Sequence, residues 1–398
     1  MALDEAFSHR DRCAIVGIGS TDFSRDSGRS ELTLATQAAL AAIDDAGLVP
    51  ADIDGIVRCD MDAVRPNDLA EVLGLPDLTY WGEVGPGGTA PSAMVGQAMA
   101  AILTGQATTV LVFRALNGRS GRRFGLAGPE AATAAAGGYG TYDEFFLPYG
   151  LLTPGQAFAV MAQRHMLEYG TNEKDLGHVA LTCRARAAAN PAAQMHGRPL
   201  TMDDYLAARM ISRPLRLFDF CLETDGACAV VVTSAARARD GRRPPVLIRA
   251  VAQGSVPSPQ PGLQYPVLMR KSITELPARA VARTLYRRAG LGPDDIDVAQ
   301  IYDCFTITVL IQLEDYGFCA KGEGGAFVSS GAIDLGGPLP INTGGGHMSE
   351  GYIHGMNHIV EGVRQIRGDS TSQVAGADVC LVTSTPLPPG SALILTAA

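Results

Sequence analysis

The stretch A-G-L-V-P-A-D-I-D at residues 46–54 returns as A-G-L-G-P-D-D-I-D at residues 289–297, and the two copies agree at seven of nine positions. Alanine-rich stretches with apolar residues at helical spacing precede both copies, at 33–45 and 277–288. A short apolar segment typical of a β-strand follows each copy. The repeat therefore predicts two halves that share one α/β fold.

Further apolar segments fit a doubled α/β unit, because a sheet covered by helices on both faces needs strands that are apolar throughout. The expected helices are residues 92–103, 307–316 and 356–367. The expected strands are residues 13–19, 109–113, 228–233, 246–251 and 391–396.

The texture of the chain changes between the two halves. Residues 119–155 are rich in Gly, Ala, Tyr and Phe without periodicity, and residues 156–214 are polar and helical in pattern. We interpret residues 119–214 as an inserted loop domain. The N-terminal half then comprises residues 1–118 and 215–245, and the C-terminal half comprises residues 246–398.

Composition excludes several classes of function. The net charge of −9 argues against nucleic acid as a partner, since phosphates attract basic surfaces. No apolar run reaches the roughly 18–20 residues of a membrane span, and residues 1–5 do not resemble a secretory signal. The eight cysteines form no C-x-x-C pair, which favours buried free thiols. We expect a cytoplasmic protein.

Two segments of the second half concentrate polar residues. Residues 301–306 read I-Y-D-C-F-T, and residues 342–355 read N-T-G-G-G-H-M-S-E-G-Y-I-H-G. Consecutive glycines let a backbone approach a ligand closely. We therefore expect Gly344, Gly345 and Gly346 to serve close packing and a ligand-facing turn together.

These two segments, the repeat and the insertion together resemble the lipid-transfer-protein branch of the thiolase superfamily, which is related to the sterol-carrier-protein thiolases. The resemblance spans essentially the whole chain. It implies a duplicated fold in five layers, α/β/α/β/α. It also implies a homodimer in which sheets pair edge to edge, with strand 109–113 as the expected edge.

The chain departs from thiolases at three positions. The stretch that resembles the thiolase nucleophile segment, G-P-G-G-T-A-P-S at residues 85–92, contains no cysteine, and we expect its Gly88 to line the substrate site. Tyr302 replaces the polar residue of an oxyanion hole, and Tyr352 replaces the histidine of the G-H-P motif. Cys380 matches the acid/base cysteine. Because an acyl-enzyme needs a thiolate and a base, none is expected here.

A retro-aldol cleavage of a β-hydroxyacyl-CoA needs an acid and a base but no nucleophile. We predict Tyr302 and Tyr352 in these roles, without assigning which is which, and Cys380 in support. Asp303 either orients Tyr302 or caps the following helix. His354 is either a proton partner or CoA contact, or a structural histidine.

The resemblance implies the steroid side-chain-cleaving aldolases, which release propionyl-CoA and act with a small OB-fold partner as a heterotetramer. No cofactor or metal is expected, since CoA enters as part of the substrate. Two alternatives stay open: a thiolase or acyltransferase with another nucleophile, and a non-catalytic acyl-CoA-binding subunit.

Overall fold

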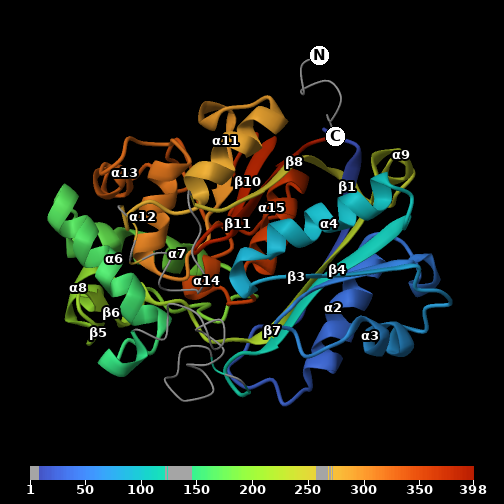
Figure 1. Cartoon of the computed structure of the whole chain (residues 1–398), viewed down its shortest axis with the longest axis horizontal. Coiled ribbons are helices and arrows are strands. Elements are labelled where there is room, and N and C mark those ends of the chain that lie inside the picture. Colours follow the sequence, from blue (N-terminus) through green and yellow to red (C-terminus); the bar gives the residue numbers. More distant parts are fainter. Residues whose placement is uncertain (1–8, 122, 124–145, 257–267, 269, 271) are drawn as a thin grey trace.

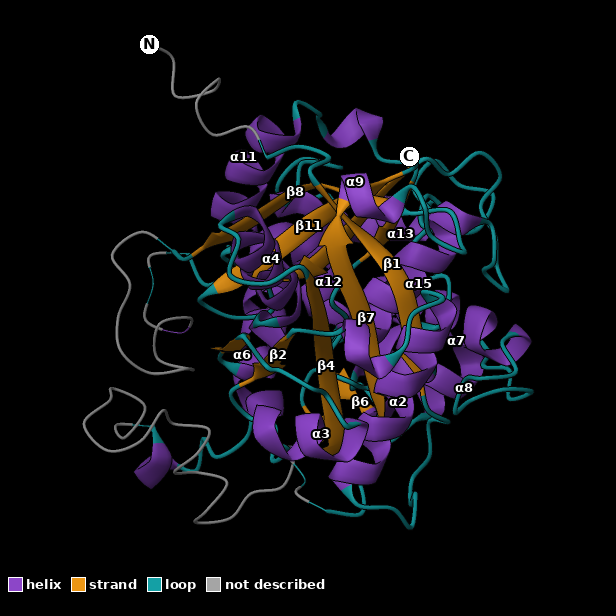
Figure 2. Cartoon of the chain, turned by 90° about the vertical axis from the view of Figure 1, so that its right-hand side faces the viewer, coloured by secondary structure: helices purple, strands orange, loops and turns teal. Residues whose placement is uncertain are grey.

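The computed structural model describes residues 9–121, 123, 146–256, 268, 270 and 272–398. Within them, one mixed sheet runs in the order β3-β2-β4-β7-β1-β8-β11-β10-β9. Figure 2 shows its strands with helices on both sides. The strands are β1 (Cys13–Ser20), β2 (Gly55–Cys59), β3 (Tyr80–Val84), β4 (Thr109–Asn117), β7 (Asp225–Ser234), β8 (Val246–Gly254), β9 (Val298–Gln300), β10 (Val379–Ser384) and β11 (Gly390–Thr396).

The two halves meet where β1 pairs antiparallel with β8, through Ala14–Leu247 and Ile15–Val246. On either side of this seam the strand order mirrors itself. β1, β7, β4 and β2 of the N-terminal half correspond to β8, β11, β10 and β9 of the C-terminal half. This mirror confirms the duplication that the repeated motif predicts, and in Figure 1 the blue and the orange-red halves lie side by side.

The repeated motif performs the same task in each half. Gly47 follows α2 (Glu31–Asp45) and Gly290 follows α11 (Ala278–Ala289). At φ values of +71° and +67°, both adopt the left-handed conformation that glycine adopts most easily. Asp54 accepts hydrogen bonds from the backbone N–H groups that begin β4, with Thr109 N at 2.8 Å. Asp297 does the same at β10, with Val379 N at 2.8 Å. The last aspartate of each copy thus fixes the start of the neighbouring parallel strand.

Five layers follow from the helix contacts. α4 (Pro91–Leu103) and α15 (Met356–Arg367) contact strands of both halves, so they form the middle layer. α2 (Glu31–Asp45) and α3 (Pro66–Leu73) cover the outer face of the N-terminal part of the sheet, β3 to β1. α11 (Ala278–Ala289) covers the outer face of the C-terminal part, β8 to β9. The predicted five-layered arrangement is confirmed. Short α9 (Ala235–Ala238) connects β7 to β8.

The insertion packs against the C-terminal half. It contains α6 (Pro154–Tyr169), α7 (Glu173–Ala189), α8 (Met202–Ala207) and β5 (Met210–Ser212), which pairs with β6 (Leu215–Arg216) just beyond the expected insertion. In Figure 1 these elements lie beside the C-terminal half. α7 contacts α12 (Thr306–Asp315), α13 (Gly324–Ser329) and α14 (Gly346–Ser349), α6 contacts α12, and residues of these helices share a hydrophobic core. Residues 124–145 of the expected insertion lie outside the described residues, and the exact domain boundaries stay a prediction.

The expected sheet edge is wrong. β4 does not lie at an edge but between β2 and β7, where its apolar side chains are buried on both faces. Among the described strands, β3 ends the sheet on this side, and its Trp81 is 62% exposed. The sequence analysis did not identify β3, because Y-W-G-E-V at residues 80–84 is neither continuously apolar nor alternating.

All eight cysteines are free thiols, six of them buried, in agreement with the expectation from their spacing. Among the described helices, none combines the length and the apolar character needed to cross a bilayer.

Candidate active site

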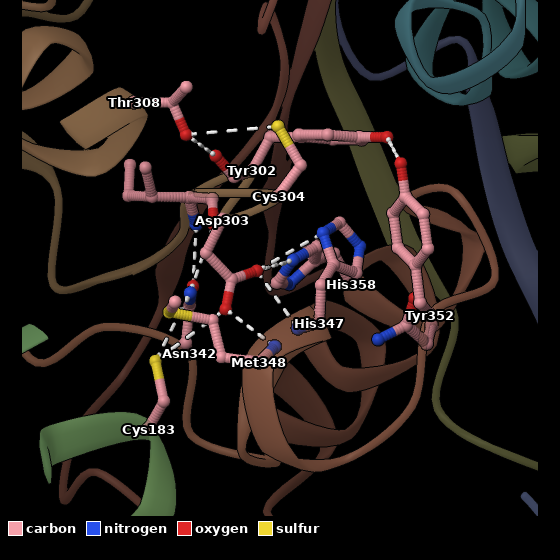
Figure 3. Close-up of polar contacts among 12 residues, drawn as sticks. Cys183, Tyr302, Asp303, Cys304, Thr308, Asn342, His347, Met348, Tyr352 and His358 are labelled. Carbon is pink, nitrogen blue, oxygen red and sulfur yellow. Dashed lines mark hydrogen bonds and ion pairs between the residues drawn. The ribbon is translucent and has the colours of Figure 1, made fainter. Parts of the chain in front are cut away.

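Tyr302 and Tyr352 meet at the junction of the two halves, with their phenol oxygens 2.9 Å apart. Tyr302 follows β9, and Tyr352 lies between α14 and α15. Figure 3 shows the two rings pointing toward each other from different segments. The two tyrosines that the sequence analysis assigned to one reaction thus lie together, while their catalytic roles stay a prediction.

Buried hydrogen bonds hold the backbone of both tyrosines. Gln312 of α12 donates from Nε2 to the Tyr302 carbonyl at 2.7 Å, and its Oε1 accepts from the Thr383 hydroxyl at 2.7 Å. The same Thr383 hydroxyl accepts from Tyr302 N at 2.8 Å. Tyr352 N donates to the Thr224 hydroxyl at 2.9 Å. Strand ends, α12 and the loop before β7 therefore fix where the phenols meet.

Gly88 lies directly against the Tyr302 phenol. A β-carbon built at Gly88 would overlap the Tyr302 oxygen, so no side chain fits there while Tyr302 keeps its position. Gly88 belongs to the one-turn 3₁₀ helix before α4, in the segment that resembles the nucleophile segment of thiolases. The described site thus has a phenol pair in contact with the segment that would present a thiol.

The cysteines near the tyrosines do not provide a reactive thiolate. Cys304 and Cys221 are the thiols beside Tyr302, and burial raises the pKa of each far above the ordinary value. A thiol with a raised pKa is protonated and a poor nucleophile. This environment disfavours an acyl-enzyme on these residues.

Asp303 forms a buried cluster with two histidines. Its Oδ1 lies 3.0 Å from His358 Nε2 and 3.1 Å from His347 Nδ1. It also accepts backbone hydrogen bonds from His347 N at 2.9 Å and Met348 N at 3.2 Å (Figure 3). Although burial raises the pKa of Asp303, these partners outweigh it and hold the pKa below its ordinary value.

The ligand atoms of Asp303, His347 and His358 lie within 4.8 Å of one another, which is the spacing of a metal-binding group. The carboxylate, however, already receives donors from His358 and from two backbone N–H groups. The arrangement is that of a hydrogen-bonded cluster that holds the turn carrying His347. Of the two roles considered for Asp303, helix capping is wrong, because the N-cap of α12 is Phe305 and has no side-chain cap.

His347 is a residue beside the tyrosine pair to which the sequence analysis assigned no role. Its ring contacts both phenols edge-on, with centroid distances of 4.5 Å to Tyr302 and 4.9 Å to Tyr352. Burial lowers its pKa well below the ordinary value, so the imidazole is neutral. The sequence around His347 does not predict its contacts with the two phenols, because these contacts depend on how the turn folds around Asp303.

His354 connects the tyrosine pair to a buried arginine. The His354 ring lies 4.6 Å from the Tyr352 ring, and its Nδ1 accepts from Arg114 Nη2 at 2.5 Å. Arg114 also faces Asp62, at 3.7 Å between Nη1 and Oδ1. The sequence analysis missed Arg114, although a charged residue inside the otherwise apolar strand β4 was a usable signal.

The three consecutive glycines pack closely against neighbouring residues. Side-chain atoms at Gly344 would meet the Glu350 carboxylate, at Gly345 they would meet Ala187, and at Gly346 they would meet Asp303. All three glycines are buried. The expected close packing is therefore confirmed, and it brings the turn onto Asp303, while a contact of these glycines with the substrate or its CoA part stays a prediction.

Cys380 lies apart from the tyrosine pair. It is fully buried in the apolar core between α15 and β10, and its Sγ donates to the Leu381 carbonyl at 3.7 Å. Burial raises its pKa strongly. Thr383, near the end of β10, holds Tyr302, whereas Cys380 is the second residue of this strand. The structure therefore does not bring Cys380 to the tyrosine pair.

Burial also raises the pKa of both tyrosines well above the ordinary value, while the charge of Arg114 opposes this shift at Tyr302. Both phenols are consequently protonated at neutral pH. They are suited to donate hydrogen bonds to a carbonyl oxygen and a proton to a carbanion.

A duplicated, five-layered α/β fold with paired tyrosines at its centre defines a thiolase-fold protein without a thiol nucleophile. Residues 264–393 match the family model of the thiolase C-terminal domain. A solved human mitochondrial 3-ketoacyl-CoA thiolase shares the fold, at a TM-score of 0.67 and 14% identity over 98% of this chain and 99% of that one.

Other relatives are much more similar in sequence. The chain is 47% identical to the 17-hydroxy-3-oxo-4-pregnene-20-carboxyl-CoA lyase of Mycobacterium tuberculosis, over 96% of this chain and 99% of the relative. It is 46% identical to the steroid side-chain-cleaving aldolase of Thermomonospora curvata, over 96% and 97%. The solved Ltp2-ChsH2(DUF35) aldolase matches at a TM-score of 0.91 and 44% identity, over 98% and 99%. The chain therefore belongs to the thiolase superfamily, in its branch of steroid side-chain-cleaving aldolases.

Proposed function

We propose that this protein cleaves a carbon–carbon bond in a β-hydroxyacyl-CoA by a retro-aldol reaction, without a covalent intermediate. The observation that carries the proposal is the pair of phenol oxygens 2.9 Å apart at a site where Gly88 leaves no room for a thiol-bearing side chain. Acid–base groups without a nucleophile suit a lyase better than an acyltransferase.

The reaction balances with side chains alone. Removal of the β-hydroxyl proton turns that carbon into a carbonyl, and the bond to the α-carbon breaks. The electron pair of this bond passes to the thioester as an enolate, which takes a proton at the α-carbon. Tyr302 and Tyr352 handle the two proton transfers as a relay: one phenol takes the β-hydroxyl proton while its own proton passes across the hydrogen bond between the phenols, and the other phenol protonates the α-carbon. Hydrogen bonds from the site stabilise the enolate oxygen. No cofactor takes part, because CoA enters with the substrate.

The substrate class we propose is a steroid side-chain CoA thioester with a tertiary β-hydroxyl group. Support comes from the similarity, over nearly the full length of both chains, to the Mycobacterium tuberculosis relative, which is named for a 17-hydroxy steroid 20-carboxyl-CoA. For a thioester of that kind the products are a 17-ketosteroid and propionyl-CoA.

The test is incubation with such a thioester in the presence and in the absence of free CoA. Release of propionyl-CoA and ketosteroid without free CoA marks a lyase. Cleavage that requires free CoA, as in a thiolase, or binding without cleavage, as in a scaffold subunit, would contradict the proposal.

We further propose a homodimer that binds two copies of a small OB-fold partner. The exposed β3 edge with Trp81 supports pairing between copies, because an unpaired strand edge is a ready surface for another strand. The solved Ltp2-ChsH2(DUF35) aldolase, whose name includes a second protein, supports the partner. A cytoplasmic location is proposed from the free thiols, since disulfides are rare in the reducing cytosol.

A further inference from the structure

Arg114 lies beside the tyrosine pair but is fully buried, on a strand that is otherwise apolar. Burying a charge is costly unless the charge is paired and hydrogen-bonded. Asp62 is 3.7 Å away, beyond hydrogen-bonding distance, and its own charge is buried as well. Within the described part of the chain, Arg114 Nε and Nη1 have no hydrogen-bond partner.

A second buried arginine shows what a structural role looks like. Arg367 donates from Nη1 to Asp45 at 2.6 Å and from Nη2 to the Val16 carbonyl at 2.8 Å, joining α15 to the N-terminal half. Arg114 instead makes its short contact, 2.5 Å, with the His354 ring. Stability alone does not account for a buried guanidinium whose shortest hydrogen bond goes to a neutral imidazole and not to a carboxylate.

The contact has consequences for the tyrosines. Since a guanidinium only donates, His354 Nδ1 must accept, which fixes the tautomer with the proton on Nε2. The imidazole so oriented lies against the Tyr352 ring at 4.6 Å. The charge of Arg114 also acts on both phenols and opposes the effect of burial on the pKa of Tyr302.

We propose that Arg114 is a positioning residue of this active site, which holds His354 against Tyr352 and offsets the negative charge that develops at the paired phenol oxygens. This proposal deepens the function proposed above and rests on it for the identity of the reaction. The groups that face Arg114 are Cys59 and Asp62 at the end of β2, His354, and the two tyrosines.

Two variants should shift the pKa of the paired phenols in opposite directions. Arg114→Gln removes the positive charge, so ionising a phenol becomes harder and its pKa rises. Asp62→Asn removes the opposing negative charge, so the phenol pKa falls. Burial raises the pKa of Asp62 to about 6, so above that pH the wild-type aspartate is charged and the comparison is valid. A residue that only supports the fold would not produce shifts of opposite sign.

The experiment measures two quantities on the full chain. The first is the pH dependence of kcat/KM for the steroid thioester. The second is the pH titration of tyrosinate ultraviolet absorbance without substrate, corrected with Tyr302→Phe and Tyr352→Phe to isolate the pair. We expect Arg114→Gln to move the alkaline limb of the profile, where an ionised phenol no longer donates its proton, and the titration upward by about 1–3 pH units. Asp62→Asn should move both downward, Arg114→Lys should restore part of the shift, and Arg367→Gln should leave both unchanged.

The outcomes separate this proposal from the proposed function. If wild-type protein does not cleave the thioester, the function fails, while the substrate-free titration still reports on Arg114. If folded Arg114→Gln and Asp62→Asn both titrate like the wild type, Arg114 is structural and the proposal is wrong. Should Arg114→Gln not fold, an unshifted Asp62→Asn is sufficient to overturn it.

Discussion

Gly88 and Tyr302 come from opposite halves of the molecule and lie in direct contact. Any β-carbon at position 88 would overlap the Tyr302 phenol oxygen, so a side chain at position 88 and the observed position of Tyr302 exclude each other. A cysteine at position 88 could therefore not be accommodated unless Tyr302 moved first.

Gly88→Ala tests this relationship with one methyl group. Tyr302 must shift away from Tyr352, and misplacing a reacting group by about 1 Å can lower the rate about 10²-fold. We expect a loss of kcat of that order for thioester cleavage. Gly336→Ala is the control, since no atom lies within 4 Å of a β-carbon there and it should keep wild-type turnover. Normal turnover of Gly88→Ala would show that the observed Tyr302 position is not required.

Tyr302→Phe and Tyr352→Phe each remove a phenol oxygen and keep the ring. Because general acid–base catalysis contributes about 10²–10⁴-fold, each variant should lose turnover in that range. Steady-state kinetics with the steroid thioester measure the loss. Tyr286→Phe is the matched control, since its hydroxyl only donates to the Tyr316 carbonyl at 3.0 Å and should not affect turnover.

Cysteine substitutions test the absence of a covalent step. Cys380→Ala and Cys304→Ser should keep most activity, because neither thiol takes part in the proposed reaction. The retro-aldol mechanism would have to be abandoned if both Phe variants turned over normally while one cysteine variant was inactive.

Trp81→Glu tests the proposed dimer. A charge on the exposed edge strand β3 opposes strand pairing between copies, so light scattering should detect a monomer for this variant and a dimer for the wild type. Val72→Glu, at a position 54% exposed on α3, should remain dimeric. A wild-type monomer at micromolar concentration, or a Trp81→Glu dimer, would exclude β3 as the interface.

Glu350→Gln should remove a pH-dependent loss of stability. Burial, reinforced by Glu361, raises the pKa of Glu350 from 4.5 to about 7. Between these values the unfolded chain has released the proton while the folded chain retains it, so stability falls as pH rises. A shift of this size corresponds to about 3 kcal/mol.

Urea unfolding at several pH values measures this effect. The variant should exceed the wild type in unfolding free energy above pH about 7 and match it below pH about 4.5. The exposed substitution Glu71→Gln should show no such pH-dependent difference. Equal curves for wild type and Glu350→Gln would mean that Glu350 is ionised in the fold without cost.

The sequence by itself determined the duplication and the pair at the centre of the site. Helix, glycine turn, D-I-D motif and strand are local signals, and each works within a short segment: the glycine ends the helix and the aspartate meets the next strand. Tyr302 and Tyr352 were identified because they stand in recognisable motifs. Cys380 also fitted a motif, but the pattern could not reveal that its end of β10 lies in the core.

Only the tertiary structure decided what surrounds the tyrosines. Arg114 and His354 are 240 residues apart in the chain, and Gly88 and Tyr302 come from different halves, so no local pattern records their contacts. His347 joins both phenols because the buried charge of Asp303 gathers donors from two segments. Segment types follow from short-range backbone and side-chain preferences, whereas the polarity of a buried site depends on which distant side chains the packed layers bring together.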